Sequence, residues 1–184
     1  MIMIMRDPIS RLFEDARCVA LGPNDTLFQT GARVAEMYRI RSGRVVLRRH
    51  TASGSVLIVQ TATAGMILAE ASAYSDRYHC EAVAVAASTR VEALPKARFR
   101  AALGADLALA EAWAAMLARG VQAARFKAEV RSLPKVSGRL DAWLDAGNTL
   151  PEKGRLQEVA AELSVTREAL YRELARRRSG KLPR

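Results

Sequence analysis

The sequence is poor in the residues that build disulfides and metal sites. Its 184 residues include two cysteines, Cys18 and Cys80, and two histidines, His50 and His79. Two cysteines give no disulfide framework and fit a reducing cytoplasm. Neither histidine stands near a credible pair of nucleophile and acid, and the sequence has no cluster of metal ligands. Although Cys80 follows His79, neighbours in a strand point to opposite faces, so adjacency does not make an activated thiolate.

Long apolar runs and glycine-rich loops are also missing. No apolar run approaches the roughly 18 residues that a membrane span needs. The opening MIMIMRDP has no basic region before its short apolar stretch, so it is a poor secretion signal. A phosphate-binding glycine-rich loop is absent as well. These absences argue against a membrane partner and against an enzyme.

Positive charge is abundant and is concentrated near the end of the chain. The formal net charge is +10. Residues 151–184 hold nine Lys and Arg against five Glu, a balance of +4, whereas the preceding 150 residues hold 20 against 14 acidic residues, a balance of +6. Charge per residue is therefore about threefold higher in the final segment. Such an excess favours polyanionic partners, and the basic face is expected at the C-terminus.

From Leu21 to about Leu94 the chain reads as a series of short strands. The runs DTLFQTG, EMYRIRSG, RVVLRRH, SVLIVQT, EAVAVAA and RVEAL are mostly rich in Val, Ile or Leu, and glycines punctuate them. The clearest hairpin is RVVLRRH-TASGS-VLIVQT. Strands at such regular spacing predict a sandwich or barrel, although AVAVAAS could pass for helix on propensity alone. With the helices that follow, the fold class is α+β.

An Ala-rich helical pattern occupies residues 97–132 and presents two apolar faces. Residues that step by four and three form a heptad seam: Leu103, Leu107, Ala110, Ala114, Leu117, Val121, Ala124 and Ala128. A second stripe lies on another face: Leu109, Trp113, Met116, Gly120 and Ala123. We expect this stripe to pack on the β domain and the seam to pair with the same helix of a second subunit. The alternative is one core helix in a monomer. Pro134 ends the helix, which makes SLPKVSG a hinge.

The segment LQEVAAELSVTREALYRELARRR predicts two short helices joined by a tight turn. Apolar residues make one face of the first helix: Leu156, Val159, Ala160 and Leu163. The turn Ser164-Val165-Thr166 breaks that pattern, and Thr166 can cap a second helix. This spacing is typical of a helix-turn-helix motif, in which the second helix lies in the major groove of DNA.

The outward side chains of the second helix suit DNA. An Arg can donate a bidentate pair to guanine, a Glu can accept from cytosine, and the terminal arginines suit phosphates. The expected DNA-contacting residues are Thr166, Arg167, Glu168, Tyr171, Arg172, Arg176 and Arg177. The alternative is an ordinary solvated hairpin with a charged face.

Together these features resemble the Crp/Fnr (catabolite activator and fumarate-nitrate regulator) superfamily over nearly the whole chain. TREALYR is similar to the family's SRETVxR, so Arg167, Glu168 and Arg172 take base- and phosphate-contacting positions, and EMYRIRSGRVVL resembles its strand–Gly–strand segment. The resemblance implies a cyclic-nucleotide-binding-like β-roll (jelly roll) at 1–102. It further implies a long dimerisation helix at 103–133 and a helix-turn-helix DNA-binding domain at 134–184.

The family's cyclic-nucleotide pocket is altered in this sequence. Members that bind cyclic nucleotides have a Gly-Glu pair followed by Arg-Ser/Thr-Ala. Here Glu70 is kept, but Ala69 replaces the Gly, and Cys80-Glu81-Ala82 replaces the second motif. A carboxylate beside a phosphate is repulsive and no bidentate donor remains, so we expect no tight cyclic-nucleotide binding. The effector is unknown, and the candidate pocket residues are Glu70, Arg77, His79, Cys80 and Glu81.

The family's metal cofactors also fit poorly. Two cysteines far apart cannot supply the four ligands of an iron–sulfur cluster. His79 and Cys80 lie near the axial ligands of haem-binding relatives, but their opposite directions favour a buried thiol and a half-exposed histidine over haem. Glu70 also fits a structural role, capping backbone amides in the β-roll.

Two departures from the family pattern concern the predicted helix-turn-helix, called the reading head from here on because it would contact the bases of DNA. Ser164 stands where the family often has Gly, and a left-handed backbone there would cost roughly 1 kcal/mol. The sequence stops at SGKLPR, where the resemblance implies a β-hairpin wing, so we expect the wing to be truncated or missing and DNA binding to be weak.

The leading hypothesis is a homodimeric, sequence-specific DNA-binding transcription regulator of the Crp/Fnr type. Its expected partners are double-stranded DNA, a second copy of the chain and RNA polymerase, in the cytoplasm. A change in the β-roll would shift the pairing of the long helices, and the hinge around Pro134 would re-aim the reading heads. The alternative is a sensory or protein-interaction module of the same fold whose reading head has decayed.

Overall fold

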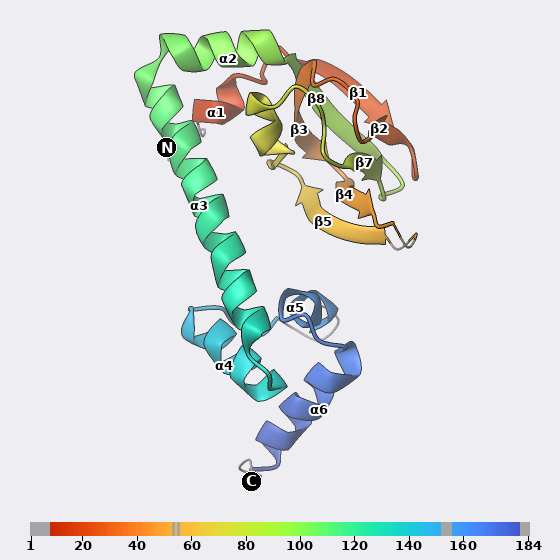
Figure 1. Ribbon diagram of the computed structural model, residues 1–184, viewed down its shortest axis with the longest axis vertical. Coiled ribbons are helices and arrows are strands. Elements are labelled where there is room, and N and C mark those ends of the chain that lie inside the picture. Colours follow the sequence, from red (N-terminus) through yellow and green to blue (C-terminus); the bar gives the residue numbers. More distant parts are fainter. Residues whose placement is uncertain (1–7, 53, 55, 152–155, 181–184) are drawn as a thin grey trace, which may run out of the picture. The chain divides into compact units, whose positions relative to one another are not determined.

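The computed structural model describes residues 8–52, 54, 56–151 and 156–180 (Figure 1). Contacts divide the chain into an N-terminal unit, Met1–Leu117, and a C-terminal unit, Ala118–Arg184. Helix α3 runs through this boundary.

The N-terminal unit is built on two antiparallel sheets, each with four strands in the described residues (Figure 1). One sheet has the order β1-β8-β3-β6, formed by Arg17–Leu21, Thr89–Pro95, Glu36–Ser42 and Ile67–Leu68. The other has the order β2-β7-β4-β5, formed by Thr26–Phe28, Glu81–Ala84, Arg44–His50 and Val56–Thr63. The predicted sandwich is therefore confirmed, and the ambiguous segment EAVA is a strand.

The core of the sandwich lies between these two sheets. Alternate residues of β4 point inward, so Val45 and Leu47 are buried. Phe28 stacks on Tyr78 with ring centroids 3.6 Å apart, and the Tyr78 hydroxyl donates to a backbone carbonyl at 2.8 Å. Gly43, between β3 and β4, has a φ of +85°, and a Cβ there would lie 2.5 Å from the carbonyl oxygen of Ser88. Only glycine therefore fits this turn.

The expected hairpin RVVLRRH–VLIVQT is formed by β4 and β5. The strands pair from Arg44 with Thr63 to His50 with Val56, and the register shifts once at Leu47/Arg48. β5 stands at the edge of its sheet, and its first four residues, Val56–Val59, are 50–66% exposed.

The predicted single helix over residues 97–132 is two helices, α2 (Lys96–Ala105) and α3 (Leu107–Ser132), bent by 114°. The break falls at Asp106, whose extended backbone interrupts the helix and whose Oδ1 accepts from the Leu109 amide at 3.1 Å. Asp106 thus caps α3, which sequence periodicity alone does not reveal. The expected seam residue Leu103 consequently belongs to α2 and is buried in the N-terminal unit.

A second apolar core joins the helices to the sandwich. Phe99 of α2 packs edge-on against Trp113 of α3 at 4.9 Å and faces Phe13, which follows the short helix α1 (Pro8–Arg11). The 3₁₀ helix η1 (Glu70–Tyr74) contributes Ala73. Leu109 and Trp113, from the second stripe, are buried here and Met116 packs against them, so the first part of the stripe packs on its own β domain as predicted. The last two stripe residues, Gly120 and Ala123, are exposed instead.

The C-terminal unit contains the end of α3 and three further described helices. These are α4 (Val136–Asp145), α5 (Leu156–Glu162) and α6 (Arg167–Arg178). Their shared core includes Val130 of α3, Leu140 and Trp143 of α4, Leu163 after α5, and Leu170 of α6. The helical conformation is interrupted between Ser132 and Val136, around Pro134 as predicted, and α4 begins three residues before the motif RLDAWLDAG.

Across the described residues, no individual helix has both the length and the hydropathy to cross a membrane. The pair α2 and α3 satisfies these criteria only when taken together, across its 114° bend.

Candidate functional site

The turn between α5 and α6 is held in one conformation by Arg139 of α4. Ser164 has a φ of +52°, so it has the left-handed backbone whose cost was considered from the sequence. The Arg139 Nη1 donates to the carbonyl oxygens of Leu163 at 3.1 Å and Ser164 at 2.9 Å. Its Nε and Nη2 donate to the carbonyl oxygens of Leu133 at 2.7 Å and Arg131 at 2.9 Å. One guanidinium therefore joins the end of α3 to the turn.

The N-terminal half of α6 presents a polar, exposed face. Thr166 caps the helix, since its Oγ1 accepts from the Ala169 amide at 3.2 Å. The guanidinium of Arg167 lies 5.2 Å from the ring centroid of Tyr171, so this pair forms a cation–π contact. Glu168 and Arg172 are also exposed, while Leu170 is fully buried. The first five residues predicted to contact DNA thus share an accessible surface.

The last two predicted residues, Arg176 and Arg177, are instead bound within the protein. Both donate to Glu173, at 2.6 and 2.8 Å, and the Glu173 side chain is only 9% exposed. Arg177 also pairs with Asp141 of α4 at 2.7 Å and donates to the Ser137 carbonyl oxygen at 3.0 Å. The hydrogen bond from Arg176 holds the pKa of Glu173 below its usual value. These contacts give Arg177 a part in joining α6 to α4.

Sequence reasoning missed Arg139 and Glu173. A signal for Glu173 exists, because arginines three and four residues later lie on the same helix face. Arg139 has no comparable signal, because its acceptors are backbone carbonyls up to 25 residues away in the chain.

In the candidate pocket of the β-roll, Glu70 and the residue before it both make contacts with Gln60. Ala69 has a φ of +50°, so it adopts the left-handed backbone for which the family uses Gly. The Glu70 carboxylate accepts from the side-chain amide of Gln60 at 3.3 Å, and Gln60 accepts from the Ala69 amide at 3.4 Å. The expected capping of backbone amides by Glu70 is therefore replaced by a contact through Gln60.

The other candidate pocket residues do not form one cluster. Cys80 is buried, and burial raises the pKa of its thiol, whereas His79 is exposed. This matches the expected buried thiol. Arg77 donates to the Gly31 carbonyl oxygen at 2.7 Å. The cation that lowers the pKa of Cys80, against the larger effect of burial, is Arg49. The sequence did not single out this residue, which donates to the His79 carbonyl oxygen at 3.2 Å.

The surroundings of Glu81 differ from those expected from the sequence. Its carboxylate was expected to face a bound phosphate, but it binds Arg48 at 2.6 Å and His50 at 2.7 Å. Hydrogen bonds from Arg48, and then from His50, lower the pKa of Glu81. Cys80 is buried just before β7, whereas Glu81, the first residue of β7, pairs with Arg48 of the neighbouring strand β4. Only the missing arginine therefore disfavours a nucleotide phosphate at this position.

The seam of α3 is largely uncovered. Leu107 is 76% and Val121 50% exposed, and Ala114 and Ala124 are exposed too, while Ala110 and Leu117 are half-buried. In the part of the chain that the structure describes, no group of three or more His, Cys, Asp or Glu residues could hold a metal ion.

One family model and several solved structures are similar to this chain. The sequence model described as "Cyclic nucleotide-binding domain" matches residues 18–106, and no curated protein matches the chain. The resemblance to Crp/Fnr-type regulators is confirmed. FixK2 from Bradyrhizobium japonicum has 17% identity and a TM-score of 0.64, with 92% of this chain and 88% of that chain covered.

Two further Crp/Fnr-type structures cover almost the whole chain. The c-di-GMP-responsive global regulator CLP of Xanthomonas campestris has 18% identity and a TM-score of 0.62, covering 95% of this chain and 92% of that one. The catabolite activator protein of Thermus thermophilus has 23% identity and a TM-score of 0.57, covering 99% and 89%. At these identities the likeness is one of fold.

Proposed function

We propose that the chain is a homodimeric transcription regulator that reads double-stranded DNA with α6. In this proposal α5, the turn at Ser164 and α6 form a helix-turn-helix. The observation that carries it is the face of α6 formed by Thr166, Arg167, Glu168, Tyr171 and Arg172, which lies opposite the buried Leu170 and is exposed along its whole length.

The chemistry of this face fits base edges in a major groove. Arg167 and Arg172 carry planar guanidinium groups that can donate two hydrogen bonds to one guanine. Glu168 can accept from the amino group of cytosine. The contact with the Tyr171 ring limits the positions open to Arg167, so less conformational freedom is lost when it binds.

Affinity for the DNA phosphates is proposed to come from other residues than those that select the bases. Arg178 is exposed at the end of α6 and stands ready for a phosphate. Arg176 and Arg177 are partly neutralised by Glu173 and Asp141, so we assign them to holding α6 in place. The proposal therefore divides the seven predicted residues into five that read and two that support.

The second subunit is proposed to pair along the α3 seam. Leu107, Ala114, Val121 and Ala124 are exposed although their heptad spacing fits a coiled coil. Two-fold pairing would present two α6 helices to successive major grooves about 34 Å apart. Two-fold symmetric DNA sites are therefore expected.

Fluorescence anisotropy tests the proposal with promoter DNA from the protein's own locus, at about 50 and about 200 mM salt. The unmodified protein should bind, and more weakly at high salt. Arg167→Ala and Arg172→Ala should each cost about 1–3 kcal/mol in binding free energy. Arg90→Ala, which removes an exposed arginine from β8, is the matched control and should have no comparable effect. No binding at low salt by the folded protein would contradict the proposal.

The second candidate is a sensory or protein-interaction module with a decayed reading head. The engagement of Arg176 and Arg177 by acidic neighbours favours it, since it removes free positive charge from α6. In that case the protein would dimerise and unfold cooperatively, and the salt dependence of its DNA binding would be the same for Arg167→Ala as for Arg90→Ala.

A further inference from the structure

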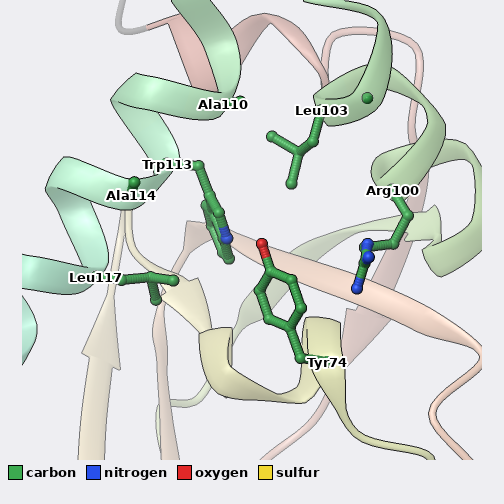
Figure 2. A pocket seen from close by; sticks show the side chains of 8 residues that line it. Tyr74, Arg100, Leu103, Ala110, Trp113, Ala114 and Leu117 are labelled. Carbon is green, nitrogen blue, oxygen red and sulfur yellow. The ribbon is translucent and has the colours of Figure 1, made fainter. Parts of the chain in front are cut away.

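A pocket of about 300 Å³ lies where η1, α2 and α3 meet, wholly within the N-terminal unit (Figure 2). Its wall is mainly apolar and includes Leu103, Ala114 and Leu117. This volume is at the lower end of the range for small-molecule sites, which combine apolar walls with a few polar groups. The pocket lies outside the group of β-roll residues considered above.

Trp113 places an unsatisfied donor at this pocket. The residue is 1% exposed, and its Nε1 is buried without a hydrogen-bond partner. Figure 2 shows the nitrogen edge of the indole turned toward the phenol end of Tyr74. Buried tryptophan N–H groups usually have an acceptor, so the missing one points to a ligand that supplies it.

Arg100 supplies the charge. Its guanidinium lies 4.4 Å from the ring centroid of Tyr74, and Nη1 donates to the Ala73 carbonyl oxygen at 3.2 Å. A guanidinium has five N–H donors, so most of its capacity remains after this bond. Among the described residues that line the pocket there is no carboxylate to neutralise it. The polar groups are therefore donors that favour an anion.

We propose that this pocket binds a small monocarboxylic acid with an apolar body. The carboxylate accepts from Arg100 and from the Trp113 indole, and the apolar body lies against Leu103, Ala114 and Leu117. One guanidinium and one neutral N–H match a single negative charge, whereas a dianion in this apolar wall would be left partly unpaired.

Tyr74 controls access to the indole in this arrangement. It is 57% exposed, and exposed side chains change rotamer on the picosecond to nanosecond timescale. Its phenol end faces the indole nitrogen of Trp113, and its ring contacts Arg100. The proposed binding mode therefore requires Tyr74 to move aside when the acid reaches Nε1.

Calorimetry at constant ionic strength tests the proposal on the full chain without DNA. The probes are sodium benzoate, phenylacetate and 4-methylpentanoate, with benzamide and phenylacetamide as neutral matches. At least one acid should bind saturably with one site per chain, about tenfold or more tighter than the amides. No saturable binding of any acid at millimolar concentration, or equal binding of the amides, would overturn the proposal.

Variants locate the site. Arg100→Gln should weaken binding of the acid about tenfold or more, because it removes the charge while keeping an N–H donor. Arg98→Gln changes an exposed arginine on the same helix that does not line the pocket, and should leave binding unchanged. Equal affinity in both variants would overturn the assignment. Quenching of Trp113 fluorescence in a Trp143→Phe background should report the same saturation curve.

A second copy of the chain is the competing occupant of the pocket, because Ala110, Ala114 and Leu117 line the pocket and also belong to the seam. Titrations at several protein concentrations separate the two. Affinity for the acid that falls as the protein associates would show that the partner fills the pocket and would overturn the proposal. Because no DNA is present, failure here leaves the proposed reading function untouched.

Discussion

Arg139 donates through Nη1 to the carbonyl oxygen of Ser164 at 2.9 Å, and Ser164 holds the left-handed backbone that starts the turn into α6. The direction of α6 thus depends on a side chain in α4. The same guanidinium binds the carbonyl oxygens of Leu133 and Arg131, where α3 ends. A change in that segment therefore has a direct physical route to the proposed reading helix.

Arg139→Lys should destabilise the C-terminal unit by about 2 kcal/mol. A lysine ammonium cannot replace a planar fork that reaches four carbonyl oxygens, and a hydrogen bond to a charged group contributes about 1.5–3 kcal/mol net. Hydrogen exchange of α5 and α6 measures the loss. Arg125→Lys, at an exposed position of α3, is the control. Equal protection in the two variants would show that the Arg139 bonds do not hold the turn.

Ser164→Gly should stabilise the C-terminal unit by about 1 kcal/mol, because glycine adopts a positive φ without the cost that Cβ imposes. The carbonyl oxygen that binds Arg139 is kept. Urea unfolding followed by Trp143 fluorescence measures the gain. Ser88→Gly, at a residue without a positive φ, should give no such gain. A destabilised Ser164→Gly would mean that the serine side chain contributes more than its backbone costs.

The C-terminal unit should become less stable in acid, because the stabilising contacts of the Glu173 carboxylate are lost when it is protonated. Its pKa in the folded protein lies below the usual value of 4.5, chiefly through the hydrogen bond from Arg176. A depressed folded pKa gives stability that is fully present above pH 4.5 and is lost as the pH falls through the folded pKa.

Glu173→Gln should therefore cost about 1 kcal/mol at neutral pH and flatten the acid limb of the stability curve. Urea unfolding at a series of pH values from neutral to below 4.5 measures both effects. Glu168→Gln, on the exposed face of the same helix, should keep the acid limb. An unchanged acid limb in Glu173→Gln would place the acid sensitivity elsewhere.

Cyclic nucleotides should not bind tightly. By the resemblance to cyclic-nucleotide binders, Cys80 stands where they have the phosphate-binding arginine. Burial raises the pKa of its thiol, so Cys80 supplies neither charge nor a bidentate donor. Calorimetry with cyclic AMP and cyclic GMP should show no micromolar binding. Micromolar affinity would mean that a neighbouring cation such as Arg49 has taken over the phosphate.

The strands and helices could be predicted because each buries one face and therefore repeats its apolar residues with a fixed period. β8 shows the strand period, since Val91 and Ala93 are buried and the residues before each of them are not. Leu156, Val159 and Leu163 show the period of a helix. The break at Asp106 could not be predicted in this way. The apolar steps continue through it, and one capping hydrogen bond to the Leu109 amide accompanies the change of direction.

Some residues of the candidate site could likewise be predicted from the sequence, and others could not. Exposure of Arg167 and Arg172 follows from helix geometry once Leu170 is buried, so sequence alone identifies that face. The pairing of Arg177 with Asp141 depends on how α6 packs on α4, which no local pattern encodes. The same holds for Glu81, whose partners come from the adjacent strand β4.

The central claim is that α6 reads duplex DNA, in two copies. Selection of binding sites from random duplex DNA, at low salt and with the full chain, tests it most directly. The account predicts enrichment of a two-fold symmetric sequence whose half-sites are centred about one helical turn, roughly 10 base pairs, apart. It also predicts that Arg167→Ala relaxes the choice at one position in each half-site. No enriched sequence from a folded, dimeric protein would contradict it.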